Sequence, residues 1–574
     1  MRVYKLEIKN FRGIKSLDWS PCPGINCLIG SGDSGKSTIL DALELCIGAR
    51  RNISVSDSDF YLLDVESPIQ ITATIGALSD ELKRIDAYGM YLRSFNCETG
   101  EVGQEPEAGH ETVLVLRLTI GADLEPVFRL ISDRAEAAGH DRSLNWKDRA
   151  TMAPTRLGNY ANYNFSWQRG SLLNRLSEER ADTSAELLKA ARDARASFGD
   201  QAKGQLAEAL EKIDGAALEL GIPIGGEVQA LLDAHSISFS GGTVSLHDGS
   251  GIPLRSLGLG STRLLTAGLQ KKVEAKTSVV LIDEVEHGLE PHRIMRLLDA
   301  LGAKDKDPEL QVFMTSHSPV VVRELSCIQL WVVRPNTHGH EIKPLGETEE
   351  FQGTIRLFPD ALLAPSVLVC EGATEVGFIR GIDQYRQEQG GISLTARGVA
   401  LVDGGGSQTF KRANAFAALG YRVAVLRDSD VDIDSGAEAT FEGAGGIIFS
   451  WQEGCAIEDM LFRYLTETAV MGLLDLAIEF KETSLVEEHI RTASSNSIRL
   501  DEIQMEPMLE GLTADSREAL GSASKLSSGW FKSIGQMEKA ARSVIAPDFV
   551  NDLGAFAESV DKVFAWIANG GHSD

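Results

Sequence analysis

Eight residues near the start of the chain, GSGDSGKS from Gly30 to Ser37, constrain its fold more than any other feature. They match the pattern G-x-x-x-x-G-K-[ST], they follow an apolar run, and they precede a segment typical of a helix. The glycines allow a tight turn whose backbone N–H groups point inward, and a lysine and a hydroxyl stand at its end. We therefore expect a strand, a phosphate-binding loop and a helix, in an α/β domain that binds a nucleoside triphosphate.

Each side chain at the end of this loop has an expected role. Lys36 would neutralise the β- and γ-phosphates, and the Ser37 hydroxyl would hold Mg²⁺. The residues expected to bind ATP here are Gly30, Gly32, Asp33, Ser34, Gly35, Lys36, Ser37 and Thr38. A glycine-rich turn without a ligand is the alternative, and the motifs further along the chain decide between the two.

Length, charge and cysteine content limit the remaining possibilities. A chain of 574 residues is too long for one hydrophobic core, and its net charge of −27 argues against a general nucleic-acid coat. Any nucleic-acid site must then be a local basic groove. The seven cysteines are scattered without a C-x-x-C pair, so we expect reduced core residues. No apolar stretch approaches 18 residues, and we expect a cytoplasmic protein with no membrane segment.

Residues 1–165 are expected to form the first lobe of the nucleotide-binding domain. The pattern predicts strands at 2–8, 24–29, 69–75 and 112–120, a helix over 37–47 and an acidic loop over 98–111. Residues 166–235 would form an insertion of amphipathic helices, which either contacts a second chain or packs within its own. A second lobe is expected over 236–360.

The second lobe contains a pair of carboxylates after a strand. An apolar run over 277–282 ends in Asp283 and Glu284. The first would order the Mg²⁺ shell, and the second would activate the attacking water. Apolar runs followed by Asp-Glu are common, but this one follows the phosphate loop in the order that a nucleotide-hydrolysing domain requires.

Two further motifs flank that strand. Ser256 and Gly258 open a helix whose N-terminus would offer donors to a phosphate, and a strand from Gln311 leads to His317, which would contact the γ-phosphate. The four motifs together resemble the head of ABC-type ATPases, in the branch shared by SMC-like proteins and the OLD (overcoming lysogenization defect) family. The resemblance implies that 256–261 is a signature loop touching ATP on a second subunit, and hence a homodimer or higher oligomer. The loop departs from the usual L-S-G-G-Q.

Carboxylates also follow the strands predicted in the second half of the chain, over 361–574. Strands at 366–370, 398–402 and 421–426 alternate with helices, which predicts a small parallel sheet with its site at the carboxyl ends of the strands. Glu371 follows the first strand, and Asp428 and Asp430 follow the third.

Three converging carboxylates repel one another unless cations lie among them, so we expect Mg²⁺ or Mn²⁺. Two such ions would suit phosphodiester cleavage. The alternative is acidic loops at the strand ends that hold no metal. Asp403 follows the second strand and is a weaker candidate, because the glycines after it suit a tight turn.

This second pattern is similar to the Toprim fold of topoisomerases, primases and OLD-family nucleases. An ABC-type head followed by Toprim is the OLD arrangement, and the chain resembles the second class of that family, like the nuclease subunit of Gabija anti-phage systems. That class implies a late metal ligand at Glu458 and a catalytic lysine at Lys532, in SGWFKSIG. Lys525 and Lys539 stand nearby, and an ordinary surface lysine is the alternative for Lys532.

The resemblance implies a site and a function. Glu371, Glu375, Asp428, Asp430 and Glu458 would hold the ions, and Lys532 would assist the transition state. Glu375 is included because it stands four residues after Glu371 and would share its helical face. The expected protein is an ATP-binding, metal-dependent DNA endonuclease whose Toprim site is regulated by the head, in anti-phage defence, with a possible UvrD-like helicase partner. A non-cleaving ATPase that senses or scaffolds nucleic acid is the alternative, and a primase-like nucleotidyl transferase is a third possibility.

Overall fold

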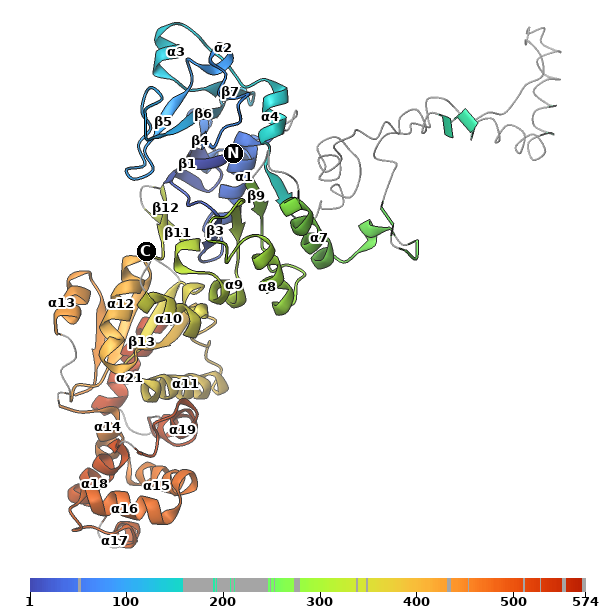
Figure 1. Ribbon diagram of the computed structural model, residues 1–574. Helices are drawn as coiled ribbons and strands as arrows, with labels where there is room; N and C mark the ends of the chain where they lie inside the picture. The colour runs from blue at the N-terminus through green and yellow to red at the C-terminus, as the bar shows by residue number, and fades with distance from the viewer. Residues whose placement is uncertain are drawn as a thin grey trace. The chain divides into compact units, whose positions relative to one another are not determined.

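The computed structural model describes residues 1–49, 53–157, 253–272, 279–336, 339–346, 349–430, 435–452, 454–508, 511–526, 528–549 and 554–569, with a few residues between 189 and 251. They form two compact units, Met1–Cys27 with Ser37–Ser316 and Leu28–Lys36 with His317–Asp574. Figure 1 shows their elements in chain order. The helices expected over 171–220 and nearly all of the insertion expected over 166–235 lie outside the described residues, so the four domain boundaries stay predictions.

An antiparallel sheet occupies the beginning of the first unit. Its strands run in the order β2-β1-β4-β6-β5, and β7 also pairs with β6. The predicted strands at 69–75 and 112–120 are confirmed, and the one at 2–8 extends three residues further. The bounds are β1 (Arg2–Phe11), β2 (Ile14–Trp19), β4 (Ile69–Gly76), β5 (Arg93–Phe95), β6 (Glu111–Ile120) and β7 (Pro126–Leu130).

Buried parallel strands form the centre of the nucleotide-binding region. Strands β8 (Thr155–Leu157), β9 (Val279–Ile282) and β10 (Gln311–Thr315) are parallel neighbours, and β3 (Ile25–Ile29) follows β10 in the order. Every residue of β9 and β10 is buried, which explains the apolar sequence VVLI of β9 and the apolar centre VFM of β10. The helices of this region are α1 (Lys36–Ile47), α4 (Trp146–Met152), α7 (Leu259–Lys272) and α8 (Pro291–Ala300).

The second unit contains the small parallel sheet that the sequence predicts. Its strands run in the order β14-β13-β15-β16 and are all parallel. Their bounds are β13 (Ser366–Cys370), β14 (Val399–Asp403), β15 (Arg422–Arg427) and β16 (Ile447–Ser450), with helices α11 (Ala373–Glu388), α12 (Thr409–Ala418) and α13 (Ser435–Gly443). A hairpin of β11 (Leu330–Asn336) and β12 (Gly339–Pro344), which the sequence did not reveal, precedes the sheet with α9 (Pro319–Glu324) and α10 (Glu349–Leu357).

The carboxyl-terminal helices share one hydrophobic core with this sheet, from Leu368 on β13 to Ile567 near the end of the last helix. Figure 1 shows α14–α18 gathered together in orange and red. The bounds are α14 (Ile457–Tyr464), α15 (Glu467–Lys481), α16 (Thr483–Ala493), α17 (Leu500–Met505), α18 (Ala514–Lys525), α19 (Ile534–Ala540), α20 (Ala546–Phe549) and α21 (Ala555–Ala568).

Two glycines allow α19 to lie directly against α11. A Cβ at Gly377 would lie 2.5 Å from the Ile534 carbonyl oxygen, and one at Gly381 would lie 2.5 Å from that of Glu538. Because both glycines are on one helical face, the two backbones approach more closely than larger residues would permit. This contact fixes the helix after Lys532 against the helix that carries Glu375.

The cysteines are free thiols, and five of the seven are buried as expected. Cys97 is exposed and Cys22 is half-buried, so the expectation of core positions is wrong for Cys97, which stands at the end of an edge strand. Among the described residues, no helix combines the length and apolar character that a membrane crossing needs.

Candidate functional site

The phosphate loop is closed by its own lysine. Lys36 Nζ donates to the carbonyl oxygens of Gly30 at 3.1 Å and Ser31 at 2.7 Å, and to Ser34 Oγ at 3.1 Å. Lys36 is 5% exposed, so the ammonium lies inside the ring of the loop. A phosphate entering that ring would meet a cation already held at its centre.

The loop needs glycine where the sequence has it. Gly30 has φ +143°, and a Cβ there would lie 2.7 Å from the Val333 carbonyl oxygen. Gly35 has φ +85° and Asp33 has φ 58°, so the backbone turns through left-handed conformations on both sides of Ser34. Gly32 is exposed, and Thr38 is half-buried in the first turn of α1.

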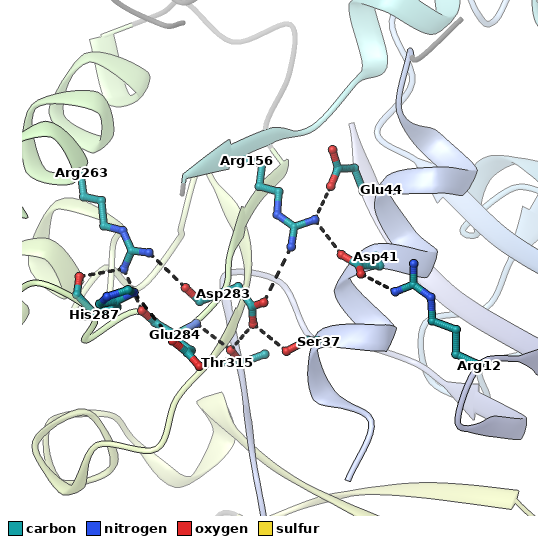
Figure 2. A network of polar contacts seen from close by, with 10 residues as sticks. All are labelled: Arg12, Ser37, Asp41, Glu44, Arg156, Arg263, Asp283, Glu284, His287 and Thr315. Atoms are coloured by element: carbon teal, nitrogen blue, oxygen red, sulfur yellow. Dashed lines mark hydrogen bonds and ion pairs between the residues drawn. The ribbon is translucent and has the colours of Figure 1, made fainter. Parts of the chain in front are cut away.

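Asp283 contacts hydroxyl and guanidinium groups of the kind found in magnesium–nucleotide sites, as Figure 2 shows. Its Oδ1 accepts hydrogen bonds from Ser37 Oγ at 3.0 Å and from Thr315 Oγ1 at 2.6 Å. Its Oδ2 lies 3.8 Å from Arg156 Nη2. Ser37 and Asp283, which are each predicted to serve Mg²⁺, therefore lie in contact, although they are 246 positions apart. Sequence reasoning missed Thr315 and Arg156.

Glu284 is held by its backbone and extends its carboxylate outward. Its φ is +47°, its N–H donates to Thr315 Oγ1 at 2.8 Å, and its side chain is 59% exposed. Buried Arg263 on α7 donates to the carbonyl oxygens of Glu284 at 2.7 Å and His287 at 3.1 Å. The turn after β9, with Glu284 in a left-handed conformation, is thus tied to α7, and it leaves the Glu284 carboxylate exposed. Activation of water by Glu284 stays a prediction.

A second arginine network borders α1. Arg156 Nη1 contacts Asp41 at 2.7 Å and Glu44 at 2.5 Å, and Arg12 Nη1 contacts the other oxygen of Asp41 at 2.6 Å. Asp59 accepts from Arg12 Nε at 2.8 Å. When Asp283 is counted, four carboxylates of this region have an arginine partner. The two arginines Arg12 and Arg156 serve all four, so the protein compensates their charge only in part.

The remaining predicted nucleotide contacts lie on exposed loops. Ser256 and Gly258 are exposed just before α7, and His317 is exposed just after β10. Within α7, a Cβ at Gly260 would lie 2.4 Å from the Gly288 carbonyl oxygen, so this glycine allows the helix to rest on the loop after Glu284. The contact of Ser256, Gly258 and His317 with a nucleotide stays a prediction.

In the second unit, Glu371 and Asp428 meet at the carboxyl ends of adjacent strands β13 and β15. Glu371 Oε2 accepts the backbone N–H of Asp428 at 2.9 Å, and Asp428 Oδ1 accepts that of Ile457 at 3.0 Å. Ile457 is the first residue of α14, so its N–H belongs to a helix N-terminus that favours a negative group. These bonds bring β13, β15 and α14 to one point.

Two further carboxylates reach the same point from helices. Glu375 on α11 is 3% exposed and accepts the N–H of Gly372 at 2.8 Å, while Glu458 on α14 is 2% exposed. Burial, with the charges of Glu458 and Glu371, raises the pKa of Glu375 to about 7. Burial, with the charges of Glu375, Glu458 and Glu371, raises the pKa of Asp428 to about 9. These carboxylates therefore lie near enough for the charge of one to raise the pKa of another.

Lys532 is the cation that lies against this cluster. Its Nζ contacts Glu458 Oε1 at 2.6 Å. The segment before it is anchored, because Trp530 and Phe531 are fully buried and Trp530 Nε1 donates to His489 Nδ1 at 3.1 Å. Its ammonium contacts Glu458, while 39% of the side chain is exposed to solvent and so accessible to a ligand.

A second lysine has a comparable partner. Lys525 Nζ contacts Asp459 Oδ2 at 2.8 Å, and the same oxygen accepts the N–H of Ala456 at 2.9 Å. Asp459 therefore caps α14 and holds a lysine. Lys539 instead contacts exposed Glu479 at 2.6 Å. The adjacent acids of α14 each bind one lysine, which no spacing rule indicated.

Two predicted acids differ from the main cluster. Asp430 is exposed, and its charge adds to the burial that raises the pKa of Glu371. Asp403 Oδ1 accepts the N–H of Gly405 at 2.8 Å, so it closes its own turn. A Cβ at Gly404 would lie 2.7 Å from the Cys370 carbonyl oxygen. Glycine is needed at this position because the ends of β13 and β14 approach each other closely.

The chemistry of the carboxylate cluster fits a divalent cation. Glu371, Glu375, Asp428 and Glu458 supply hard oxygen donors, and their shared charge is balanced only in part by Lys532. One oxygen each of Glu371 and Asp428 is fixed by a backbone N–H. Among the described residues, no three such side chains are already arranged as a metal cage. A cation would have to draw their remaining oxygens together.

Three family models match the chain. An AAA ATPase domain matches residues 1–110, an AAA domain described as a putative AbiEii toxin of a type IV toxin–antitoxin system matches 134–323, and an "overcoming lysogenization defect protein-like, TOPRIM domain" matches 362–430. The last span covers β13, β14 and β15 with Glu371 and Asp428. The models and the parallel sheet confirm the expected α/β class, an ATPase head followed by a Toprim domain.

The curated relatives match only short parts of the chain. The solved structures match more of it, but at low sequence identity. The DNA replication and repair protein RecF of Chlorobium phaeovibrioides is 25% identical over 18% of this chain and 30% of its own length, and that of Porphyromonas gingivalis is 38% identical over 10% and 16%. The chain thus spans less than a third of these relatives. SMC head domains from Pyrococcus furiosus and Thermotoga maritima share 12% and 14% identity over 62% and 60% of this chain and 99% of theirs, with TM-scores of 0.34 and 0.29.

Proposed function

Because the chain carries the AAA-type ATPase domains and the OLD-like Toprim domain of an OLD-family ATPase–Toprim protein, we propose that it is an ATP-binding, metal-dependent DNA endonuclease. An ATPase linked to a nuclease-type domain is the coarse function that the family models support. The observation that carries the finer proposal is the group of Glu371, Glu375, Asp428 and Glu458, of which Glu375 and Glu458 are buried, with Lys532 beside it.

The proposed chemistry divides between the cation and the chain. A bound Mg²⁺ or Mn²⁺ would supply an activated water and charge stabilisation at the scissile phosphate. Glu371, Glu375, Asp428 and Glu458 would hold it, with Asp430 at the exposed edge. Lys532 would stabilise negative charge that develops on the phosphate, because its ammonium is already positioned by Glu458 and the buried Trp530–Phe531 pair.

The ATPase part would hydrolyse ATP and control the Toprim site. Lys36 and Ser37 would bind the phosphates and Mg²⁺, Asp283 would orient the Mg²⁺ shell, and Glu284 would activate water. We also propose a homo-oligomer, and a role in anti-phage defence with a UvrD-like helicase as a possible partner. These last points rest on the family resemblance alone.

Plasmid cleavage tests the proposal. The purified chain is incubated with supercoiled plasmid and Mg²⁺ or Mn²⁺, with and without ATP, beside Asp428→Ala, Lys532→Ala and the control Glu479→Ala. We expect nicking or linearisation that both site variants lose and the control keeps, because Glu479 pairs with Lys539 away from the cluster.

Absence of cleavage with either metal, while ATP turnover is intact, would favour the alternative of a non-cleaving ATPase sensor or scaffold. Incorporation of labelled nucleotides instead of nicks would favour a nucleotidyl transferase. Cleavage retained in Asp428→Ala would place the nuclease activity elsewhere.

A further inference from the structure

A pocket in the first unit is lined by one face of the antiparallel sheet. Two rows of side chains cross its strands, with Glu7 opposite Thr72 and Thr72 opposite Arg117 in one row. Lys5 opposite Thr74 begins the other. The connection between β5 and β6 adds further lining residues, and the pocket measures about 590 Å³. That volume lies within the range of small-molecule sites.

The face of the sheet that lines this pocket is polar, although most of it is buried. Thr72 is 5% exposed and Thr74 is 2% exposed. The alternate residues of the same strands, such as Leu6 and Ile71, are apolar and form the core. Strand β4 is buried on both faces, and one face carries hydroxyl groups. Buried hydroxyls need hydrogen-bond partners, so this face suits a polar ligand better than hydrophobic packing.

Two guanidinium groups in this pocket lack a carboxylate partner among the described residues. Arg93 is 8% exposed, and it donates from Nε to the Gly103 carbonyl oxygen at 2.8 Å and from Nη2 to that of Val102 at 3.5 Å. Arg117 donates from Nε to Thr72 Oγ1 at 3.0 Å. Neither Arg93 Nη1 nor the two terminal nitrogens of Arg117 donate to a protein group in the part of the chain that the structure describes.

Burial of a charge without a hydrogen-bonded counter-ion is costly; burial lowers the pKa of Arg93, and the charge of Asp133 offsets this only in part. By contrast, Arg12 contacts two carboxylates and Arg156 contacts three in the same unit. Guanidinium groups with free terminal nitrogens beside a hydroxyl are the groups that recognise phosphate. An anion in the pocket would remove the cost.

The same pocket is lined by Glu7, and by Glu101 and Glu107, which are exposed. These carboxylates would repel a polyanion such as a nucleic-acid backbone, and they would accept hydrogen bonds from hydroxyl or amino groups of a ligand. A ligand that carries both a phosphate and hydrogen-bond donors satisfies the two sets together.

We propose that this pocket binds a small phosphate-bearing ligand of about mononucleotide size, at a site separate from the phosphate loop. Arg93 and Arg117 would hold the phosphate, and the glutamates would contact the rest of the ligand. The inference is independent of the proposed nuclease activity.

Titration calorimetry of the full chain tests it, with inorganic phosphate and AMP as separate probes. A Lys36→Ala background removes binding by the phosphate loop. In that background, Arg117→Gln is the test variant, Thr74→Val is the milder one, and Arg129→Gln is the matched control, because Arg129 on β7 of the same sheet pairs with exposed Asp141 and is not among the lining residues of the pocket. Thermal unfolding of each variant establishes that it is folded.

We expect saturable binding in the Lys36→Ala chain that weakens ~10-fold or more in Arg117→Gln and is unchanged in Arg129→Gln. Binding of AMP alone would identify a nucleotide, and binding of both probes would show that the phosphate group suffices. Binding of neither probe, or equal affinity in Arg117→Gln, would overturn the proposal. Displacement of AMP by a short single-stranded oligonucleotide at equal affinity would overturn the small-ligand claim.

Discussion

Asp283 in the ATPase part and Asp428 in the Toprim domain both follow a buried parallel strand, yet their surroundings differ. Asp283 accepts from two hydroxyls and faces Arg156. Asp428 accepts one backbone N–H and is surrounded by Glu371, Glu375 and Glu458, which raise its pKa. An arginine and two hydroxyls already face the first aspartate, whereas the second lies among three carboxylates that Lys532 offsets only in part, so its need for a cation from outside is greater.

The largest effects are expected on cleavage, where this comparison is most direct. Asp428→Ala should abolish detectable plasmid cleavage, and Lys532→Ala should slow it ~100-fold or more, because a positioned cation at a developing charge contributes that much. Lys539→Ala should cleave at the wild-type rate, because its partner Glu479 lies outside the cluster. A gel time course of supercoiled plasmid measures all three, and equal loss in Lys539→Ala would contradict the assignment.

The next effect concerns the Asp283 site in the ATPase part. Thr315→Val removes a donor to Asp283 and the acceptor for the Glu284 N–H, and a hydrogen bond to a charged group contributes about 1.5–3 kcal/mol. We expect ATP turnover to fall ~10-fold or more, with plasmid cleavage in the absence of ATP unchanged. A phosphate-release assay measures the turnover, and wild-type turnover in Thr315→Val would show that this network is not used.

The carboxylates around Asp428 should make the stability of the folded chain depend on pH. The pKa values of Glu375 and Asp428 are raised to about 7 and about 9, so the folded chain binds more protons than the unfolded chain above about pH 4. In EDTA, the free energy of unfolding should therefore fall as pH rises from about 4 towards 9. Asp428→Asn should flatten that slope.

Divalent metal sharpens the same test, because a cation that binds only the folded chain stabilises it by ~2.7 kcal/mol at 100 times Kd. Urea unfolding at pH 8 with and without Mn²⁺ measures the gain. A gain of the same size in Asp428→Asn would place the metal elsewhere in the chain.

The smallest effect concerns the support of Lys532. His489→Phe leaves the buried Trp530 N–H without its acceptor, which costs about 1–3 kcal/mol of stability. We expect several-fold slower cleavage, less than the loss in Lys532→Ala, because the ammonium is displaced but present. Urea unfolding and cleavage rates together measure it, and loss of stability at an unchanged cleavage rate would mean that His489 supports the fold alone.

The sequence predicts most of what local patterning decides. The phosphate loop, the strands that end at Asp283, Glu371 and Asp428, and the parallel sheet follow from periodicity and strand-end chemistry. Glu375 is expected from its place four residues after Glu371, although Glu371 precedes α11 and the two do not share a helical face. Glu458 is expected from the family resemblance, because no spacing rule joins it to residues on other elements.

The missed contacts are long-range. Arg156 lies 115 residues from Asp41, and Thr315 lies 32 residues from Asp283, so only the fold brings them together. Lys525 was set aside as a neighbour of Lys532, and its contact with Asp459 depends on how α18 packs on α14. The arginines of the pocket are likewise unremarkable in sequence, because an absent partner is visible only in three dimensions.

Binding of Mn²⁺ to the nucleotide-free chain, measured by titration calorimetry, tests the contrast between the two aspartates most directly. If the Toprim carboxylates need an external cation, Mn²⁺ should bind the wild type and Asp283→Asn alike, and bind Asp428→Asn ~10-fold or more weakly. Unchanged binding in Asp428→Asn, or a loss confined to Asp283→Asn, would contradict the account.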